Sequence, residues 1–511
     1  MQEPEKAETI EAEQVPKGQA EAVAELKKTI TVDTVHNDEA LKVLANYAGD
    51  ETWTEKEEKL VRRKIDRRLL PILCATYGLQ YYDKAMISQA ALFGLRTDLE
   101  LVGNRYSFSS AIFYLGFIVG AYPAIVMAQR FPIERVAAGI VCVWGACLMC
   151  TAAVHNWQGL YAQRFFLGFL ESGISPMFML VVGQFYKKDE QALRMGAWYC
   201  CTGYVSIISP LINYGLGHIT GALSPWRYMY LVAGSITILY SAVIYFLMPP
   251  DPIRAKGFNE RERYIAVARL RTNNAGVRNK HFKKEQLFEL LGDVKFWIVF
   301  AMAFLIMIAN GPVSTFTPII IASFGFSTLN SLLLVMPAGL IIGTVEWVAP
   351  YVAYKVPKMR AYLVAICEMG TILAALLLWL LPRDKTGGLL FGAYTLATFG
   401  GGYAVLMGMQ IANTAGYTKR SLASSGIFVG YCLGNFTGPL LFKPKDAPEY
   451  GPGFLAVVIT SIMSAVLSIV YRMICVWENK KRDKAGTSEA FEHAYEDDLT
   501  DKKNPQFRYT L

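Results

Sequence analysis

The stretch Tyr106-Ser-Phe-Ser-Ser-Ala-Ile-Phe-Tyr-Leu-Gly-Phe-Ile-Val-Gly-Ala-Tyr-Pro-Ala-Ile-Val-Met127 decides the fold class, because it contains no charged residue and can cross a bilayer as one helix. A helix needs about 20 such residues to span the hydrocarbon core of a membrane. Further runs of this kind occur along the chain, so the sequence predicts an all-α membrane protein with 12 transmembrane helices in two six-helix halves. The runs are residues 69–93, 106–127, 134–154, 158–182, 194–217, 226–248, 296–321, 329–351, 360–381, 388–414, 420–442 and 453–475.

The composition favours a membrane protein over a soluble enzyme. Of the 511 residues, 53% are hydrophobic and only 18% are charged, which is too apolar for several soluble domains. The sequence contains no Walker loop, no histidine spacing typical of a metal site and no nucleophile elbow. We therefore expect no catalysis, no cofactor and no metal. The formal charge of +8 is spread over short clusters between the apolar runs, so we expect no nucleic-acid partner.

The basic residues also predict the orientation of the chain, because Lys and Arg are retained on the cytoplasmic side of a membrane. The segment Lys59–Arg68, before the first run, is strongly basic. If this segment is cytoplasmic, the loops on its side carry more net positive charge than the loops on the other side. The basic residues of these inner loops are Arg130, Arg135, Lys187, Lys188, Arg194, Lys355, Lys358, Arg360, Lys419 and Arg420. We predict a multi-pass protein with both termini in the cytoplasm.

The predicted spans divide the chain into five segments. They are a cytoplasmic N-terminal tail (1–68), an N-terminal six-helix bundle (69–248), a cytoplasmic linker (249–295), a C-terminal six-helix bundle (296–477) and a cytoplasmic C-terminal tail (478–511). The linker stretch Asn259–Arg271 places apolar residues at helical spacing between charges, which predicts an amphipathic helix at the membrane surface. The tail after Trp477 is polar and in places acidic, and we expect it to be disordered.

Charged residues inside the apolar runs are costly to bury and are therefore candidates for function. Asp83 and Lys84 are neighbours in the first run and point about 100 degrees apart on a helix, so one can face a cavity while the other meets another helix. Arg164 and Glu171, seven residues apart in the fourth run, share nearly one helix face. A desolvated carboxylate at Glu171 would exchange a proton near neutral pH. The alternative for these residues is a set of ion pairs that only fixes helix packing.

Polar groups in the C-terminal half are weaker candidates. Asn310-Gly311-Pro312 breaks the seventh run and would free backbone groups that can line a cavity. Three amides lie within later runs, where hydrogen bonding between helices is the alternative role: Gln410, Asn413 and Asn435. We expect structural roles for the two further carboxylates, Glu346 and Glu368.

Residues 59–480 contain a series of motifs in a recognisable order. They are Leu79-Gln-Tyr-Tyr-Asp-Lys84, Gly94-Leu-Arg-Thr-Asp-Leu-Glu-Leu-Val-Gly103, Phe113-Tyr-Leu-Gly116, Gln129-Arg-Phe-Pro132, Arg164-Phe-Phe-Leu-Gly-Phe-Leu-Glu171, Trp226-Arg-Tyr228, Asn279-Lys-His-Phe-Lys283, Asn310-Gly311, Asn413-Thr-Ala-Gly-Tyr-Thr-Lys-Arg420 and Gly434-Asn435. In this series the sequence resembles the fungal allantoate permease family, within the anion:cation symporters of the major facilitator superfamily.

The resemblance implies the major facilitator fold and proton-coupled symport of a small organic anion across the plasma membrane by alternating access. Relatives take allantoate, ureidosuccinate, nicotinate or pantothenate. The resemblance places the substrate-binding cation at Lys84 and proton-coupling carboxylates at Asp83 and Glu171. The other expected substrate contacts are Tyr82, Arg164, Asn310, Gln410, Asn413 and Asn435. We expect a monomer in the lipid bilayer. A proton-coupled exporter of a secondary metabolite and a nutrient receptor without transport remain as alternatives.

Overall fold

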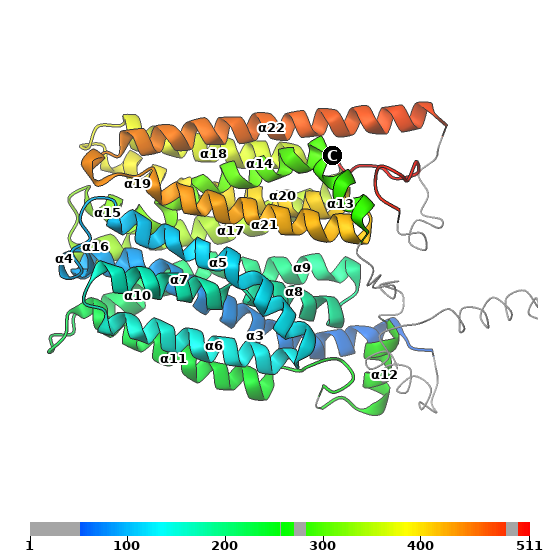
Figure 1. The fold of residues 1–511 in the computed structure, drawn as a ribbon, viewed down its shortest axis with the longest axis horizontal. Helices are drawn as coiled ribbons and strands as arrows, with labels where there is room; N and C mark the ends of the chain where they lie inside the picture. Colours follow the sequence, from blue (N-terminus) through cyan, green and yellow to red (C-terminus); the bar gives the residue numbers. More distant parts are fainter. Residues whose placement is uncertain (1–51, 256, 270–282, 487–498) are drawn as a thin grey trace, which may run out of the picture.

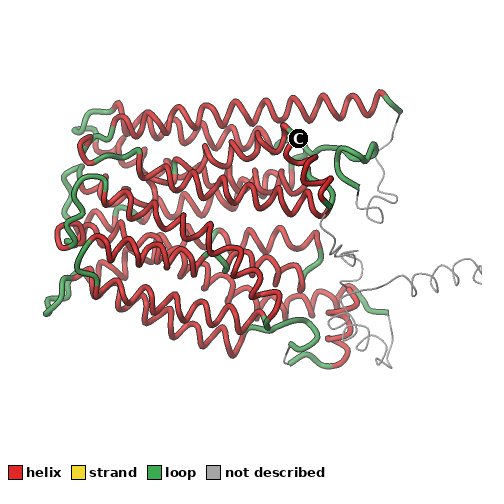
Figure 2. Tube along the Cα trace, in the orientation of Figure 1, coloured by secondary structure: helices red, strands yellow, loops and turns green. Residues whose placement is uncertain are grey.

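The computed structural model describes residues 52–255, 257–269, 283–486 and 499–511. Every regular element in these residues is a helix, which confirms the predicted all-α class (Figure 2). The residues 279–282 of one motif, and most of the predicted N-terminal tail, lie outside the described ranges.

Helices of the N-terminal half coincide with the first six predicted spans. They are α3 (Glu55–Ala90), α5 (Arg105–Arg130), α6 (Ile133–Cys150), α7 (Trp157–Glu171) with α8 (Ile174–Phe185), α9 (Lys188–Tyr199) with α10 (Cys201–Leu216), and α11 (Pro225–Leu247). The short helix α4 (Leu95–Asp98) lies in the loop between α3 and α5.

The helices of the C-terminal half correspond to the other six predicted spans. They are α14 (Val294–Ile308) with α15 (Thr317–Ala322), α16 (Thr328–Leu333) with α17 (Met336–Lys355), α18 (Arg360–Leu380), α19 (Thr386–Thr395) with α20 (Phe399–Asn413), α21 (Tyr417–Leu440) and α22 (Gly451–Lys484). Within the described residues, nine helices or helix pairs are long and apolar enough to cross a membrane on length and hydropathy alone. The other three predicted spans are α3, α9 with α10, and α21, and they are more polar because they carry charged or hydroxyl residues.

The two halves lie side by side as two groups of roughly parallel helices (Figure 1). The start of α3 and the C-terminus lie at the same end of the bundle, on the right of the view, which we call the terminal end. Helices α10 and α17 pack together across the interface between the halves, as do α5 and α21. At one such contact the rings of Phe117 and Phe428 stack with centroids 5.6 Å apart.

The outer surface of the bundle is apolar. Large hydrophobic side chains such as Leu239 on α11 and Met369 on α18 are exposed, by 73% and 61%. Contiguous apolar surface of this kind is unstable in water and suits a lipid environment.

Helix α3 begins well before the membrane-spanning run that the sequence predicts. Thr54 caps its N-terminus in a capping box with Glu57, so the basic segment before residue 69 is helical and continuous with the span. The predicted amphipathic helix of the linker is α12 (Glu260–Ala268), which packs on this first part of α3. Arg261 donates a hydrogen bond to Glu57 at 2.8 Å, and this bond together with those from Thr54 lowers the pKa of the Glu57 carboxyl to about 2.

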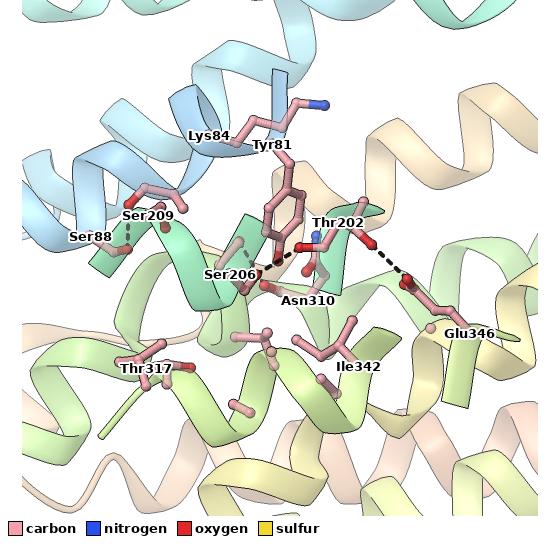
Figure 3. Close-up of a pocket in the computed structure, with 18 of the residues that line it drawn as sticks. Tyr81, Lys84, Ser88, Thr202, Ser206, Ser209, Asn310, Thr317, Ile342 and Glu346 are labelled. Carbon is pink, nitrogen blue, oxygen red and sulfur yellow. Dashed lines mark hydrogen bonds between the residues drawn. The ribbon is translucent and has the colours of Figure 1, made fainter. Parts of the chain in front are cut away.

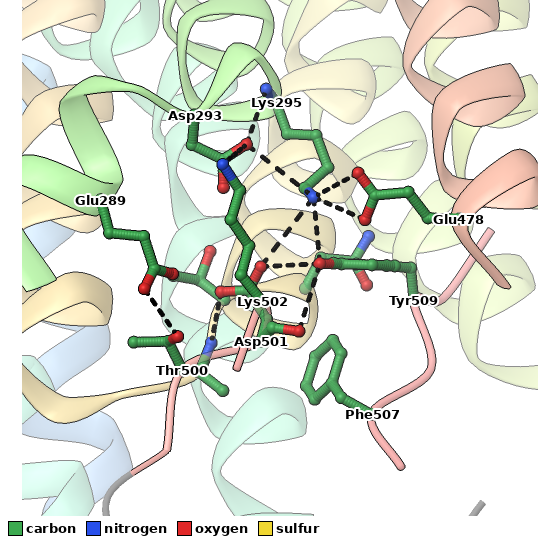
Figure 4. A network of polar contacts seen from close by, with 12 residues as sticks. Glu289, Asp293, Lys295, Glu478, Thr500, Asp501, Lys502, Phe507 and Tyr509 are labelled. Carbon is green, nitrogen blue, oxygen red and sulfur yellow. Dashed lines mark hydrogen bonds and ion pairs between the residues drawn. The ribbon is translucent and has the colours of Figure 1, made fainter. Parts of the chain in front are cut away.

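The end of the chain folds back onto the C-terminal half (Figure 4). Asp501 is 1% exposed; its carboxylate lies 2.8 Å from Lys419 Nζ and accepts a hydrogen bond from the Tyr509 hydroxyl at 2.8 Å. The Thr510 backbone N–H donates to Asn413 Oδ1 at 2.7 Å. The expectation of disorder after Trp477 is therefore wrong for the described residues, because polar groups of the tail meet buried partners of the opposite charge.

Candidate functional site

A cavity lies between the two halves, near the middle of the bundle (Figure 3). Counted with the open solvent at its mouth, the space between its lining residues is about 1120 Å³. Its polar lining residues are Tyr77, Gln80, Tyr81, Lys84, Ser88, Gln89, Tyr114, Tyr199, Thr202, Ser206, Ser209, Asn310, Ser314, Thr317, Glu346 and Tyr431. Of the described residues in this lining, Lys84 and Glu346 are the charged ones.

One face of α3 forms much of the wall. Tyr77, Gln80, Tyr81, Lys84 and Ser88 recur three or four residues apart, as residues on one side of a helix do. Tyr81 points toward Ser206 and Thr202 in Figure 3, and Lys84 lies on the far side of Tyr81 from them. Lys84, which the sequence predicts as the substrate-binding cation, is among the residues that line the cavity.

The ammonium group of Lys84 lies among an acid and two aromatic rings. Its Nζ is 4.0 Å from Glu171 Oε2, and it lies 4.8 Å and 5.5 Å from the ring centroids of Phe117 and Phe113. The Lys84 side chain is 15% exposed and that of Glu171 is 0% exposed. Aromatic faces and one carboxylate stabilise the cation where water is largely excluded, while the exposed fraction leaves it open to a ligand.

Glu171 is the last residue of α7, at a break between two helices of one span. Helix α8 begins only at Ile174, and the backbone carbonyl of Glu171 accepts a hydrogen bond from Gln80 Nε2 at 3.0 Å. Within the described residues, neither carboxylate oxygen of Glu171 has a hydrogen-bond donor. A buried carboxylate without a donor is costly to keep charged, so this group is suited to take up a proton.

Arg164 lies near this pair but outside the cavity lining. It is 3% exposed, its guanidinium is 5.0 Å from the centroid of Phe113, and its Nε donates to the carbonyl of Ser109 at 3.4 Å. Of the two residues predicted to share a helix face, Arg164 therefore lies against Phe113 and Glu171 lies beside Lys84. Arg164 itself does not reach the cavity in this state.

Two predicted site residues of α3 point away from the cavity. Asp83 is 0% exposed and accepts a hydrogen bond from Trp144 Nε1 of α6 at 2.7 Å. Tyr82 donates its hydroxyl proton to Asn213 of α10 at 2.9 Å. Both side chains connect helices of the N-terminal half, and neither lines the cavity.

The predicted amides divide into two groups. Asn310 lines the cavity, and its Nδ2 donates to Asn435 Oδ1 at 2.6 Å, so Asn435 holds Asn310 from behind. Gln410 and Asn413 lie instead at the terminal end, beside a smaller hollow that includes Lys419. They do not reach the central cavity.

The predicted break in the seventh span is present. A single π-helical turn, Pro312–Phe316, follows α14 and precedes α15. The backbone carbonyl of Asn310 accepts a hydrogen bond from the Ser314 hydroxyl at 2.8 Å. π-Helical turns of this kind are frequent at functional sites.

The structure adds residues that the sequence interpretation did not assign to the site. Tyr81 could have been found from the helical phase of Lys84, since it lies one turn before it. Glu346, expected to be structural, lines the cavity from α17, and no local pattern in its run signals this. Among the described residues, no group of three or more His, Cys, Asp or Glu side chains could hold a metal ion.

Comparisons with known proteins agree with this architecture. The profile of the Major Facilitator Superfamily matches residues 73–439. The allantoate permease of Saccharomyces cerevisiae is 32% identical over 490 residues, which cover 93% of this chain and 90% of that protein. The thiamine pathway transporter THI73 of the same yeast is 30% identical over 470 residues, covering 91% and 88%.

Solved structures show the same fold at low sequence identity. A D-xylose-proton symporter gives a TM-score of 0.60 at 14% identity, over 79% of this chain and 96% of that chain. The resemblance and the fold that the sequence motifs predict are thereby confirmed. The chain belongs to the major facilitator superfamily of membrane transporters, with the yeast allantoate permease among its relatives.

Proposed function

We propose that the chain is a secondary active symporter that imports a small organic anion together with protons across the plasma membrane. The observation that carries this proposal is the contact between Lys84 and Glu171. The cation lines the cavity between the halves, and the buried acid beside it lacks a hydrogen-bond donor among the described residues.

Charge balance at this pair would couple the proton to the anion. With Glu171 ionised and no substrate, Lys84 and Glu171 sum to zero charge. A proton alone makes the pair positive and an anion alone makes it negative, whereas both together restore neutrality. Because net charge in a low-dielectric site is costly, the empty and the fully loaded states are favoured for the movement of the two halves. Binding of either partner then promotes binding of the other.

The relatives support the substrate class. The allantoate permease takes a carboxylate by its name, and Lys84 offers this chain an ammonium group for such an anion. The basic start of α3 supports a cytoplasmic location for the terminal end, because Lys and Arg are retained on that side.

Two substitutions test the proposal in proteoliposomes that contain the purified protein. Lys84→Ala should abolish uptake of the anion while the protein stays folded. Glu171→Gln should preserve substrate counterflow but lose accumulation driven by a proton gradient, because a neutral amide mimics the protonated acid and cannot release a proton. Glu368→Gln is the matched control, since Glu368 is buried in α18 and does not line the cavity.

The outcomes separate the proposal from its rivals. Uptake that survives Lys84→Ala contradicts the role of the cation, and loss of counterflow in Glu171→Gln assigns that residue to structure. A symporter accumulates the substrate inside the vesicles when protons flow inward. Accumulation only when protons flow outward would identify a proton antiporter, as expected of an exporter.

A further inference from the structure

Three free thiols gather where α3 meets the break in the fifth span. Helix α9 ends at Tyr199 and α10 begins at Cys201, so Cys200 lies at the break. The sulfur atoms of Cys200 and Cys201 lie 3.2 Å and 3.6 Å from the backbone oxygen of Ala197. The sulfur of Cys74 on α3 lies 3.6 Å from the same oxygen. The proposed function gives these cysteines no role.

The three thiols compete for one acceptor. A carbonyl oxygen has two lone pairs, so it cannot accept well-formed hydrogen bonds from three thiols at once. The side chains of Cys74 and Cys201 also hydrogen-bond each other. Both are half-buried, whereas Cys200 is buried. Cys74 and Cys201 are therefore the pair that is in mutual contact and also partly accessible.

Helices α3 and α10 approach closely beside this pair. Gly78 and Val205 lie four residues, about one turn, after Cys74 and Cys201 on their helices. A Cβ atom at Gly78 would lie 2.9 Å from Val205 Cγ2, so only a residue without a side chain allows this approach. The close packing holds the two thiols within reach of each other.

The geometry of a disulfide favours a link between the two helices over a link within the break. The Cα atoms of a disulfide are usually about 4.4–6.8 Å apart. Neighbouring residues such as Cys200 and Cys201 have Cα atoms only about 3.8 Å apart, which lies outside this range. Residues that face each other across two closely packed helices do not have this restriction.

We infer that Cys74 and Cys201 form a redox-sensitive site, which a peroxide converts into a disulfide between α3 and α10. One thiolate attacks the peroxide oxygen, the O–O bond breaks, and a sulfenic acid and water result. The second thiol then attacks the sulfenic sulfur, the S–S bond forms, and a second water leaves. The two thiols together lose two electrons and two protons to the peroxide, and a dithiol reductant reverses the reaction.

The site is close to the terminal end of both spans. The predicted spans begin at residues 69 and 194, so each cysteine lies about two turns from the end of its span. On the next turn of α3, Tyr77 lines the cavity and packs edge-on against Trp198 with ring centroids 4.5 Å apart. A link at Cys74 and Cys201 would therefore fix α3 to the break beside this part of the cavity wall.

The test maps disulfides in the purified, reduced, full-length protein after treatment with hydrogen peroxide. The remaining thiols are alkylated, and the protein is digested without reductant for mass spectrometry. We expect a linked pair of peptides that carry Cys74 and Cys201, two hydrogen atoms lighter than the separate reduced peptides. The oxidised protein should also melt at least about 2 °C higher than the reduced protein, and dithiothreitol should remove both changes.

Serine variants identify the two partners, because serine keeps a hydrogen-bonding group of similar size. Cys74→Ser and Cys201→Ser should each abolish the linked peptides and the rise in melting temperature, whereas Cys200→Ser should keep both. Cys142→Ser is the matched control, since Cys142 is an exposed cysteine of α6.

The mapping of the wild type needs no variant, so it decides the inference even if a serine variant fails to fold. Absence of the Cys74–Cys201 link after peroxide treatment would overturn the inference. A link between Cys200 and Cys201, or between two copies of the chain, in its place would do the same. Neither readout requires a substrate, so the result is independent of the proposed transport.

Discussion

Two adjacent tyrosines show how a single step along α3 changes the role of a side chain. Tyr81 lines the cavity, whereas Tyr82 is 4% exposed and hydrogen-bonds Asn213. Successive helical residues point about 100 degrees apart, so the face that holds Lys84 includes Tyr81 and excludes Tyr82. The sequence interpretation placed Tyr82 at the substrate and did not use this phase.

The two tyrosines should respond differently to loss of the hydroxyl group. Tyr81→Phe should raise the substrate concentration for half-maximal uptake several-fold without lowering the melting temperature. Tyr82→Phe should destabilise the protein by about 1 kcal/mol, through its lost hydrogen bond, and leave that concentration unchanged. Uptake kinetics and thermal unfolding of both variants check this, and the reverse pattern would show that Tyr82 faces the substrate.

The hydrogen bond between Trp144 and Asp83 should contribute to the stability of the folded protein. Trp144→Phe removes the indole donor at 2.7 Å and should destabilise the protein by about 1–3 kcal/mol, because a buried carboxylate loses its partner. Asp83→Asn should be milder, since an amide oxygen can accept the same hydrogen bond. If Asp83→Asn also abolishes proton-driven accumulation in proteoliposomes, Asp83 takes part in proton coupling, as the sequence predicts.

At the scale of elements, the terminal end of the C-terminal half is held by a charged cluster. Lys419 of α21 lies 3.0 Å from Asp293, which caps α14, and 2.8 Å from Asp501 of the tail. It also lies 3.0 Å from Glu289 of the short helix α13 (Lys284–Leu291). Lys295 lies 2.8 Å from Glu478 of α22. These ion pairs connect four helices and the tail.

Removal of the tail carboxylate should loosen this end. Asp501→Ala leaves Lys419 with fewer anionic partners in a site that is 1% exposed, so we expect a loss of about 1–3 kcal/mol and a lower melting temperature. Lys59→Ala is the control, because its ion pair with Glu55 is exposed and should contribute little. Equal effects of the two substitutions would mean that the tail does not dock as described.

The same cluster predicts a pH dependence. Burial alone would raise the pKa of Asp293, but Lys295 and Lys419 outweigh it and lower the pKa. Burial alone would lower the pKa of Lys419, but Asp501 and Asp293 raise it. The contribution of Asp293 is present above about pH 4 and is lost as pH falls through its depressed pKa. The contribution of Lys419 is present below about pH 10 and is lost as pH rises through its elevated pKa.

Asp293→Asn isolates the acid limb, because an amide can still cap α14. The difference in melting temperature between the wild type and this variant should be nearly constant from about pH 5 to about pH 9 and should shrink below about pH 4. A difference that grows on acidification would contradict the depressed pKa of Asp293.

At the scale of the whole molecule, the halves approach each other closely where glycines of α10 and α17 face each other. A Cβ atom at Gly203 would collide with the backbone of Gly343 and lie 2.7 Å from the carbonyl of Gly339. Absence of side chains lets the two helices approach in this state. The proposed symport requires the two halves to move against each other, and this contact is one that such a movement would change.

Gly203→Ala should therefore disfavour the closed contact of α10 and α17. Overpacking of this kind costs about 1–3 kcal/mol, which corresponds to about a fivefold to hundredfold loss of the state in which α10 and α17 touch. We expect slower transport in a protein that remains folded, measured by counterflow. Gly139→Ala is the control, since a Cβ there meets open space; an equal effect in both variants would contradict the role of the contact.

Local patterns in the sequence determined the helices and the family of this protein. A run of about 20 apolar residues such as 106–127 is sufficient to specify a spanning helix, because the bilayer requires every backbone group to be paired within the segment. The cost of burying charge identified Lys84 and Glu171, which the structure brings within 4.0 Å.

Only the tertiary structure decided which of the candidate residues share a site. Whether a polar residue faces a cavity depends on the rotation of its helix, and this rotation is set by packing against distant helices. Asp83 therefore meets Trp144, Gln410 lies at the terminal end, and Glu346 lies beside Thr202 of the other half. Contacts between residues far apart in the chain, such as Asp83 and Trp144 or Thr202 and Glu346, leave no periodic signal in one sequence, so the cavity and the docked tail could not be derived from it.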